Sequence, residues 1–339
     1  MPKRPTVHDV AAEAGVSIKT VSRVVNAEAN VSAEVRSRVL AAVDTLHYVP
    51  NSVARSLKVG LGDTVGIVID SIADPFFAAL TSAAEAMALE AGLNVVFGST
   101  GYDAGRERHQ VERMAMQQVR GVILAPVQGD HSYLTRYRHS VPVVLVDRAL
   151  ELDDYDTVLV DDYGATRLAV EHLLRHGHRR IAFVGAEPRF VTMTERLRGY
   201  RDGLADAGLP LDPALVPHHV ADEAGAGAAT SLLLRERPDV TALVAANTRA
   251  GLGVVHALHT ARRTDMAMVG FGDFPLAGTL EPGITCVDQD PRMIGEVAIG
   301  HLLARLGSED QSAVTRPGER VVLPTRLVQR GSGEIAAPR

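Results

Sequence analysis

Three runs of apolar residues at helical spacing open the chain and predict three short helices that share one small core. The first helix is expected over residues 7–14, where Gly15 ends it because glycine adopts the left-handed turn conformation without steric cost. The second covers residues 17–26, with three valines on one side and polar side chains largely on the other. The third starts at Ser32 and carries a stripe of valines and leucines. A helix, a tight glycine turn and a second helix form a helix-turn-helix arrangement.

Residues 51–58 predict a further helical segment that is too short to be stable alone. Pro50 separates it from the third helix, since the residue before a proline is disfavoured in the helical region. Asn51 can cap the segment. The glycines at positions 60 and 62 then predict a flexible joint.

From Thr64 onward, short apolar runs alternate with helical stretches such as residues 75–91 and 106–118, which is typical of parallel α/β sheets. The expected buried strands form two series, at residues 65–69, 94–98, 121–125, 143–146 and 157–160, and then at 181–185, 215–220, 242–246 and 266–270. Two doubly wound α/β lobes follow from this alternation. The expected fold class is therefore a small all-α helix-turn-helix domain joined to a two-lobed α/β domain.

Charge divides the chain at the same place as the hydrophobic pattern. Residues 1–62 hold eight Lys and Arg against five Asp and Glu, or +3, and the remaining 27 against 36 give −9, which together make the net charge of −6. All three lysines, Lys3, Lys19 and Lys58, lie in the first piece. A basic N-terminal piece followed by an acidic one indicates a nucleic-acid-binding module joined to a domain of another kind. The alternative is that the excess of three positive charges arose by chance.

Size and composition restrict the class of protein. A chain of 339 residues is too long for one ordinary core, and an apolar content of 46% suits a compact α/β protein. No run of 18 uncharged apolar residues predicts a membrane span, and the basic N-terminus has no apolar stretch behind it, as a signal peptide would. The single cysteine, Cys286, excludes an internal disulfide framework, so we expect a cytoplasmic protein.

Several short sequence motifs in the first sixty residues together resemble the motifs of a known protein family. They read TVHDVA at residues 6–11, GVS at 15–17, TVSRVVN at 20–26, YVPN at 48–51 and SVARSL at 52–57. The first four resemble the DNA-binding head of the LacI/GalR family of bacterial transcription repressors. The last resembles that family's hinge helix, most closely the purine-repressor version. The match is nearly continuous over more than fifty residues.

The resemblance implies that the second helix lies in the major groove and reads base edges near its N-terminal end. Ile18 and Lys19 match variable base-reading positions of the family. Arg23 matches a common one and can pair with guanine through two hydrogen bonds, the alternative being a solvated surface charge. The residues better suited to phosphate contacts are Thr20, Ser22 and Asn26.

Leu57 matches the leucine that, in the family, enters the minor groove at the operator centre and kinks the duplex. The alternative is that Leu57 packs against the body of the protein. The full set of expected DNA contacts is Thr6, Ser17, Ile18, Lys19, Thr20, Ser22, Arg23, Asn26, Asn51, Ala54, Arg55, Leu57 and Lys58.

The alternating body resembles the type I periplasmic sugar-binding fold of the same family. The resemblance implies that the chain crosses between lobes near residues 161–164, 287–290 and 323–326, and that a ligand binds between the lobes at the carboxyl ends of strands. The expected domains are a helix-turn-helix head at residues 1–50, a hinge helix and linker at 51–62, an N-terminal lobe at 63–162 and 290–323, and a C-terminal lobe at 163–289 and 324–336.

Polar and aromatic residues near strand ends are the candidates for binding an effector. They are Asp74, Phe77, Arg148, Asp162, Arg196, Asn247 and Asp273. Phe77 could offer a ring face to a flat ligand or a pyranose. Arg196 matches the family's ligand-binding arginine, whose planar fork suits vicinal hydroxyls or a carboxylate. The alternative for each is a helix cap or a contact that closes the lobes.

Two positions depart from the family pattern. Thr248 follows Asn247, and Gly272 precedes Asp273, where the family usually has carboxylates that accept from ligand hydroxyls. Their loss makes a plain neutral hexose less certain and leaves room for an anionic or unusual effector.

Other classes of protein are poorly supported. The body lacks the glycine-rich, Walker and nucleophile-elbow motifs of common enzymes, so we expect neither an enzyme nor a cofactor. His172, His176 and His178 have ligand-like spacing, but Gly177 breaks the helix between the last two, so we expect no metal site. An exported sugar-binding receptor is the alternative for the body, and it would have no use for the head. A nucleoid-type DNA binder is disfavoured by the acidic body.

The sequence therefore predicts a ligand-responsive, sequence-specific DNA-binding regulator, most simply a repressor that binds a near-palindromic operator as a homodimer. Its effector is expected to be a sugar, a sugar acid or phosphate, or a purine-like molecule. Binding would shift the population of lobe arrangements and so separate or join the two hinge segments. The tail has no leucine heptads, so we expect no tetramer through a C-terminal coiled coil.

Overall fold

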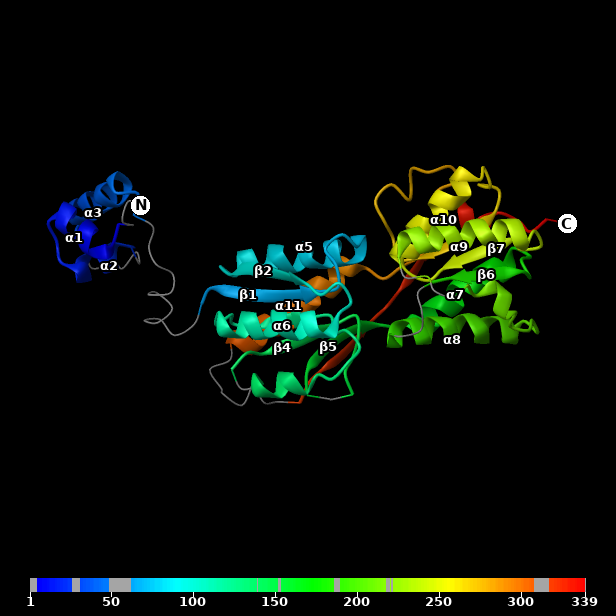
Figure 1. Ribbon diagram of the computed structural model, residues 1–339, viewed down its shortest axis with the longest axis horizontal. Coiled ribbons are helices and arrows are strands. Elements are labelled where there is room, and N and C mark those ends of the chain that lie inside the picture. The colour runs from blue at the N-terminus through cyan, green and yellow to red at the C-terminus, as the bar shows by residue number, and fades with distance from the viewer. Residues whose placement is uncertain are drawn as a thin grey trace. The chain divides into compact units, whose positions relative to one another are not determined.

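The computed structural model describes residues 5–25, 31–48, 62–138, 140–151, 154–185, 190–217, 220, 222–307 and 317–338. The chain divides into two compact units, Met1–Gly62 and Asp63–Arg339, here termed the head and the body (Figure 1). Six of the expected DNA contacts lie outside the described residues, namely Asn26, Asn51, Ala54, Arg55, Leu57 and Lys58. The expected hinge helix lies outside them as well.

The head is a bundle of three short helices. They are α1 (Val7–Ala14), α2 (Ile18–Val25) and α3 (Ala33–Thr45). Each helix contributes a fully buried valine to the shared core, and these are Val10, Val21 and Val39. Gly15 ends α1 at a φ of 62°, in the left-handed region that glycine enters without steric cost. The short turn that follows lets α2 start at once against the same core.

The first part of the body is a parallel sheet of six strands. They are β1 (Thr64–Ile69), β2 (Asn94–Ser99), β3 (Val122–Leu124), β4 (Val143–Val146), β5 (Asp156–Val160) and β10 (Arg320–Leu323). Their order in the sheet is β10-β5-β4-β3-β1-β2. We term this sheet and its helices the first lobe.

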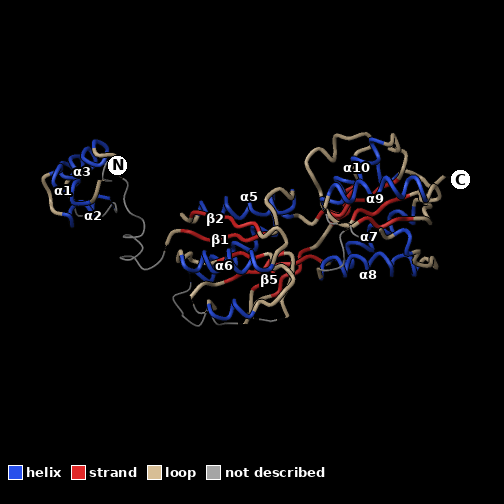
Figure 2. Tube along the Cα trace, viewed as in Figure 1, coloured by secondary structure: helices blue, strands red, loops and turns tan. Residues whose placement is uncertain are grey.

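Alternate strand residues of the first lobe face two helical layers. Ile67 and Ile69 pack with α5 (Pro75–Glu90) and α11 (Pro291–Gly307), whereas Val68 packs with α6 (Ala104–Met116) on the opposite face. A sheet buried on both faces requires continuous apolar strands, which is the pattern that the sequence shows. Figure 2 shows the strands of the body lying between layers of helices.

The second lobe is built on a five-stranded sheet. Its strands are β6 (Ile181–Val184), β7 (Ala242–Ala245), β8 (Ala267–Phe271), β9 (Thr285–Asp288) and β11 (Arg326–Val328), in the order β11-β9-β8-β7-β6. All neighbours are parallel except β11, which runs antiparallel to β9. Helices α7 (Asp162–Arg175) and α8 (Val191–Asp206) cover one face, and α9 (Glu223–Glu236) and α10 (Thr248–Thr260) cover the other. The chain passes between the two sheets after β5, after β9 and after β10.

One predicted strand is wrong. Within residues 215–220, of which 218 and 219 are not described, none belongs to a strand. A single 3₁₀ turn, Pro213–Leu215, ends there instead. Pro217 explains the difference, because it lacks the N–H that a strand donates to its neighbour.

The predicted fold class is confirmed. A helical head precedes two α/β lobes whose sheets are almost entirely parallel. Among the described residues, no helix is long and apolar enough to cross a membrane.

Candidate functional site

Helix α2 presents a polar surface because its apolar side is held in the core of the head. Val21 and Val24 are buried against α1 and α3. Ser17 precedes the helix, and its Oγ accepts a hydrogen bond from the Thr20 amide at 3.2 Å, which caps an otherwise unpaired N–H. The local sequence therefore fixes both the start of α2 and the direction in which it faces.

The expected base-reading side chains lie at the exposed start of α2. Ile18 is 42% exposed and Lys19 is exposed, whereas Ser22 and Arg23 are partly exposed one turn further on. An isoleucine exposed at this position can contact a thymine methyl group in the major groove. Thr6 lies at the start of α1, where its backbone N–H donates to Asp9 Oδ2 at 2.7 Å.

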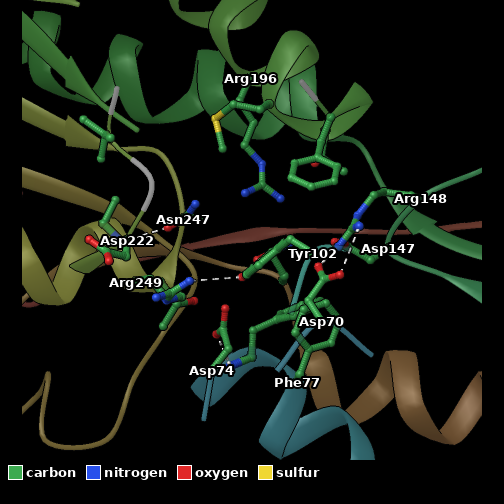
Figure 3. Close-up of a pocket in the computed structure, with 18 residues that line it drawn as sticks. Asp70, Asp74, Phe77, Tyr102, Asp147, Arg148, Arg196, Asp222, Asn247 and Arg249 are labelled. Carbon is green, nitrogen blue, oxygen red and sulfur yellow. Dashed lines mark hydrogen bonds and ion pairs between the residues drawn. The ribbon is translucent and has the colours of Figure 1, made fainter. Parts of the chain in front are cut away.

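A cleft lies between the two lobes of the body, at the carboxyl ends of their strands (Figure 3). Its cavity has a volume of about 80 Å³. The first lobe contributes Asp70, Asp74, Phe76, Phe77, Tyr102, Asp147 and Arg148, and the second lobe Phe190, Thr192, Met193, Arg196, Val220, Asp222, Asn247, Thr248, Arg249 and Ala250, with Gln289 following β9. Polar residues after parallel strands thus meet in one place, as open α/β sheets arrange them.

Five of the seven predicted effector-binding residues line this cavity, namely Asp74, Phe77, Arg148, Arg196 and Asn247. The other two do not line it. Asp162 accepts from Arg196 Nε at 2.7 Å and so supports the arginine. Asp273 instead pairs with Arg330, whose Nη1 donates to Oδ1 at 2.7 Å and whose Nη2 donates to Oδ2 at 2.6 Å.

Arg148 is held firmly in the first lobe. Its Nη1 donates to the Pro126 carbonyl at 2.8 Å, its Nε to Asp147 Oδ2 at 2.9 Å, and its Nη2 pairs with Asp70. The guanidinium also lies 4.6 Å from the centre of the Phe190 ring, across the cleft. With two carboxylates and a carbonyl already bound, this cation has little capacity to neutralise a ligand charge.

Arg196 is the corresponding arginine of the second lobe, and it is buried at 5% exposure. Its Nε donates to Asp162, its Nη1 donates to the Ala246 carbonyl at 2.8 Å, and its guanidinium carbon lies 3.8 Å from the Phe271 ring centre. Figure 3 shows the guanidinium pointing into the cavity. Its Nη2 has no hydrogen-bond partner among the described residues, so this donor faces the space that a ligand would fill.

Asp74 faces Arg196 from the other lobe, and among the described residues only one of its two oxygens accepts a hydrogen bond. It begins α5, where its Oδ1 accepts from the Phe76 amide at 3.0 Å. Burial raises the pKa of Asp74 to about 6, and the positive charge of Arg249 offsets only part of that effect. Burial likewise raises the pKa of Asp162 to about 6, against the opposing effect of Arg196.

Contacts across the cleft already join the lobes. Arg249 Nη1 donates to the Tyr102 hydroxyl at 3.4 Å, and the Tyr102 ring centre lies 5.8 Å from that of Phe190 (Figure 3). Tyr102 belongs to the first lobe and the other two residues to the second, so a change in lobe spacing would break these contacts.

Several lining residues are absent from the sequence prediction. Asp70 and Tyr102 follow the ends of β1 and β2 closely, so the rule that found Asp74 could have found them. Arg249 follows the end of β7 by four residues and could have been found in the same way, whereas Phe190 lies further from the end of β6.

The two departures from the expected carboxylate pattern are neighbours in space. A Cβ added at Gly272 would lie 2.3 Å from Thr248 Oγ1, and Gly272 has a φ of 89°. A side chain at 272 would therefore be both strained and obstructed by the threonine. The second lobe thus presents Asn247 and Arg196 to the cavity without either carboxylate.

His172 and His178 contact the C-terminal segment and do not line the cleft. His172 Nε2 lies 2.6 Å from Glu334 Oε1, and His178 Nε2 lies 2.8 Å from the Ile335 carbonyl oxygen. Burial lowers the pKa of both histidines, which favours the neutral ring. These contacts hold the end of the chain against the second lobe.

Two family models match the chain. Residues 6–51 match bacterial regulatory proteins, lacI family, and residues 62–316 match periplasmic binding proteins and sugar binding domain of LacI family. The first match covers the three helices of the head, and the second covers most of the body.

Similar proteins span the whole chain. The maltose regulon regulatory protein MalI of Escherichia coli is 30% identical, covering 96% of this chain and 98% of that protein. The HTH-type transcriptional regulator CelR of Thermobifida fusca is 34% identical over 98% of this chain and 99% of its own length.

Solved structures agree with these relatives. A complex of CelR with cellobiose has a TM-score of 0.70 at 32% identity, covering 97% of this chain and all of that one. The lac repressor dimer bound to operator and the anti-inducer ONPF has a TM-score of 0.79 at 27% identity, covering 99% and 100%. Head, body and cleft together therefore show that this chain belongs to the LacI family of bacterial regulatory proteins, which are effector-responsive DNA-binding regulators of transcription.

Proposed function

We propose that this chain is a sugar-responsive repressor that binds a near-palindromic operator as a homodimer and carries its effector in the cleft between the lobes. One observation carries the proposal: residues of both lobes line a single polar cavity, while a separate helical unit presents the polar side of α2. A ligand that touches both lobes has a different affinity for each lobe arrangement, and such a difference is what shifts a conformational equilibrium.

The lining suits a ligand with many hydroxyl groups. A hydroxyl can donate to the unused oxygen of Asp74 and accept from Arg196 Nη2, while the rings of Phe77 and Tyr102 offer apolar faces to a pyranose. The relative CelR has been solved with cellobiose, and MalI is named for the maltose regulon. A neutral sugar is therefore our choice of effector.

An anionic effector fits this lining less well, although the sequence left that possibility open. The missing carboxylates at 248 and 272 are outnumbered by carboxylates elsewhere in the lining, at Asp70, Asp74, Asp147 and Asp222. They face three arginines, of which Arg148 pairs with Asp70 and Asp147, so that Asp74 and Asp222 remain against Arg196 and Arg249. The lining therefore carries no excess positive charge that would favour a phosphate.

On the DNA side, we propose that Ile18, Lys19 and Arg23 read bases from the major groove. The remaining proposed contacts are Thr6, Ser17, Thr20, Ser22 and Asn26 in the head, with Asn51, Ala54, Arg55, Leu57 and Lys58 in the hinge. Two heads would enter half-sites about one helical turn, on the order of 34 Å, apart. This role involves no chemical step and belongs in the cytoplasm, where the DNA is, so we propose neither an enzymatic activity nor an exported receptor.

Replacing Arg23 with alanine is expected to weaken operator binding by about 1–3 kcal/mol and to relax the preference at one base pair of each half-site. Sequencing of DNA selected by the wild type and the variant would measure both effects. Arg38→Ala is the matched control, since Arg38 is exposed on α3 and its loss should change affinity without changing sequence preference. An unchanged preference in Arg23→Ala would contradict the assignment.

Effector affinity is expected to rise about tenfold as the pH rises from about 5 to about 7, because the pKa of Asp74 is about 6 and the ionised carboxylate is the better acceptor. In the ligand-free protein the raised pKa of Asp74 has the opposite effect on stability from its effect on binding. The folded state holds this proton more tightly than the unfolded chain, so the contribution of Asp74 to stability falls as the pH rises from about 4 to about 6. Calorimetry across this pH range tests the binding effect.

Asp74→Asn is the control for this pH dependence. The asparagine oxygen can still accept from the Phe76 amide, so α5 keeps its cap while the titrating group is lost. We expect weaker binding and a shallower pH profile in the variant, in which Asp162 beside Arg196 is the remaining group of the site with a pKa of about 6. A flat profile in the wild type would contradict a role for the Asp74 carboxylate.

The test of the proposed function as a whole combines two measurements. A thermal-shift screen with sugars, sugar acids, sugar phosphates and nucleobases identifies the effector class. Gel-shift titration with DNA selected by the protein then shows whether that effector changes operator affinity. A bound ligand that leaves DNA affinity unchanged would contradict the proposal.

A further inference from the structure

Four side chains form one continuous row across the cleft between the lobes. The guanidinium carbon of Arg148 lies 4.6 Å from the centre of the Phe190 ring. The Phe190 and Tyr102 ring centres lie 5.8 Å apart, and the guanidinium carbon of Arg249 lies 5.8 Å from the Tyr102 ring centre. We term this row of cation, ring, ring and cation the interlobe stack. At these separations a cation and a ring, or two rings, attract each other.

The interlobe stack alternates between the lobes at every step. Arg148 and Tyr102 follow strands β4 and β2 of the first lobe, whereas Phe190 and Arg249 lie at the starts of helices α8 and α10 of the second. Figure 3 shows Tyr102 between Arg249 and Arg148. Each neighbouring pair of the stack therefore joins one lobe to the other, so separation of the lobes breaks every pair.

One fully buried carboxylate, Asp70, positions both members of the stack that belong to the first lobe. Asp70 pairs with Arg148, and its Oδ1 accepts from the Thr100 hydroxyl at 3.3 Å. Thr100 Oγ1 in turn accepts from the Tyr102 amide at 3.1 Å. Arg148 and Tyr102 are therefore fixed within their own lobe, which lowers the conformational entropy lost when they meet the second lobe.

The backbone is strained at the same two strand ends. Tyr102 has a φ of 65° and Asp147 a φ of 66°, in the left-handed region that residues with a Cβ rarely adopt. Asp147 accepts from Arg148 Nε at 2.9 Å, so each strained residue either belongs to the stack or holds a member of it. Such strain concentrates at binding sites and switches, where surrounding contacts enforce it.

The stack consists of the protein's own side chains, so its contacts need no ligand. The cavity beside it has a volume of about 80 Å³. Pockets that hold small-molecule ligands begin at roughly 300 Å³. A ligand of ordinary size therefore requires the lobes to move apart, and that movement separates Tyr102 from Phe190.

We propose that the interlobe stack is a latch, which holds the two lobes together without a ligand and limits access to the cleft. The proposal goes beyond the function proposed above, because it concerns the body alone. It depends neither on the class of effector nor on DNA binding.

Distance measurements between the lobes test the latch in the full-length protein. Spin labels attached after Arg113→Cys on α6 and Arg201→Cys on α8 report the spacing, because both positions are exposed and the natural Cys286 is buried. We expect one narrow distance distribution in the absence of sugars and DNA. Tyr102→Ala removes the contacts with both Phe190 and Arg249, so the ratio of closed to open molecules should fall about tenfold and a second, longer distance should appear.

Two further variants show whether the effect comes from the stack. Tyr102→Phe keeps the ring and loses only the hydroxyl, which accepts from Arg249 Nη1 at 3.4 Å, so the same ratio should fall less than about threefold. Val191→Ala is the matched control, because Val191 is 66% exposed next to Phe190 and lies outside the stack. Its distance distribution should equal that of the wild type. Thermal unfolding checks that Tyr102→Ala still folds, as expected for a residue outside the hydrophobic cores of both lobes.

A tryptophan can report on the stack directly, because the chain has none. Phe190→Trp keeps an aromatic ring between Arg148 and Tyr102, and the ring should be shielded from solvent on both sides. Its fluorescence should be quenched by acrylamide more weakly than that of Val191→Trp, one residue further on. Adding Tyr102→Ala should raise the quenching of Phe190→Trp and leave that of Val191→Trp unchanged.

Either measurement can overturn the latch. An unchanged distance distribution in a folded Tyr102→Ala would show that the stack does not hold the lobes together. Equal quenching of Phe190→Trp and Val191→Trp would show that the rings do not stack, and this comparison alone decides should Tyr102→Ala fail to fold. Neither result bears on sugar or operator binding, so the function proposed above would stand.

Discussion

Replacing Arg196 with alanine is expected to weaken effector binding by about 100-fold, because hydrogen bonds to a charged group contribute about 1.5–3 kcal/mol each. The Nη2 of Arg196 faces the cavity without a protein partner among the described residues, and its other bonds fix the direction in which it points. The head has a separate core, so operator binding without effector should stay near the wild-type level. Calorimetry with the effector and gel-shift titration with the operator measure the two quantities.

The same variant is expected to destabilise the second lobe. Removing one partner of a buried ion pair leaves the other charge uncompensated, at a cost of about 3–5 kcal/mol. Here the remaining charge is Asp162, whose carboxyl pKa burial already raises to about 6 despite the arginine. A lost response could therefore arise from partial unfolding, and the experiment has to separate the two causes.

Two further variants make that separation. Asp162→Asn combined with Arg196→Ala removes both charges, which should recover most of the stability without recovering effector binding. Arg198→Ala changes an exposed arginine on the same helix, paired with Glu195, and should alter neither property. Effector affinity restored in the double variant would mean that Arg196 supports the fold and does not contact the ligand.

The three described helices of the head could be predicted well because their structure depends on neighbours in sequence. The Ser17 cap, the Gly15 turn and the valine stripe each act over a few residues, and all three appear in the structure. The strands of the body were likewise visible as apolar runs. The exception at residues 215–220 shows the limit, since the segment contains Pro217 and two histidines beside its apolar residues.

The cleft was only partly predictable, because its residues come from segments far apart in the chain. Strand ends identified Asp74 and Asn247, but the same rule also proposed Asp273, whose carboxylate is bound to Arg330, 57 positions away. No local pattern predicted that Tyr102 would meet Arg249, 147 positions later. Such pairs depend on how distant segments pack together, which the hydrophobic periodicity of single helices and strands cannot predict.

Replacing Val21 with aspartate is expected to reduce operator affinity by about tenfold or more while leaving effector affinity unchanged. Val21 is fully buried in the head, and an unpaired carboxylate there costs about 3 kcal/mol or more. A core of this size gives only marginal stability, so the head should be largely unfolded. Apparent affinity then falls in proportion to the folded fraction.

The body should be unaffected, because it is a separate compact unit with its own cores. Leu40→Asp is the matched control, since Leu40 is 47% exposed on α3 and the same new charge there stays in water. Operator affinity should then fall only slightly, through repulsion of DNA phosphates. Loss of effector binding in Val21→Asp would instead show that head and body fold as one cooperative unit. The proposed regulation would then act through the stability of the whole chain and not only through the spacing of two lobes.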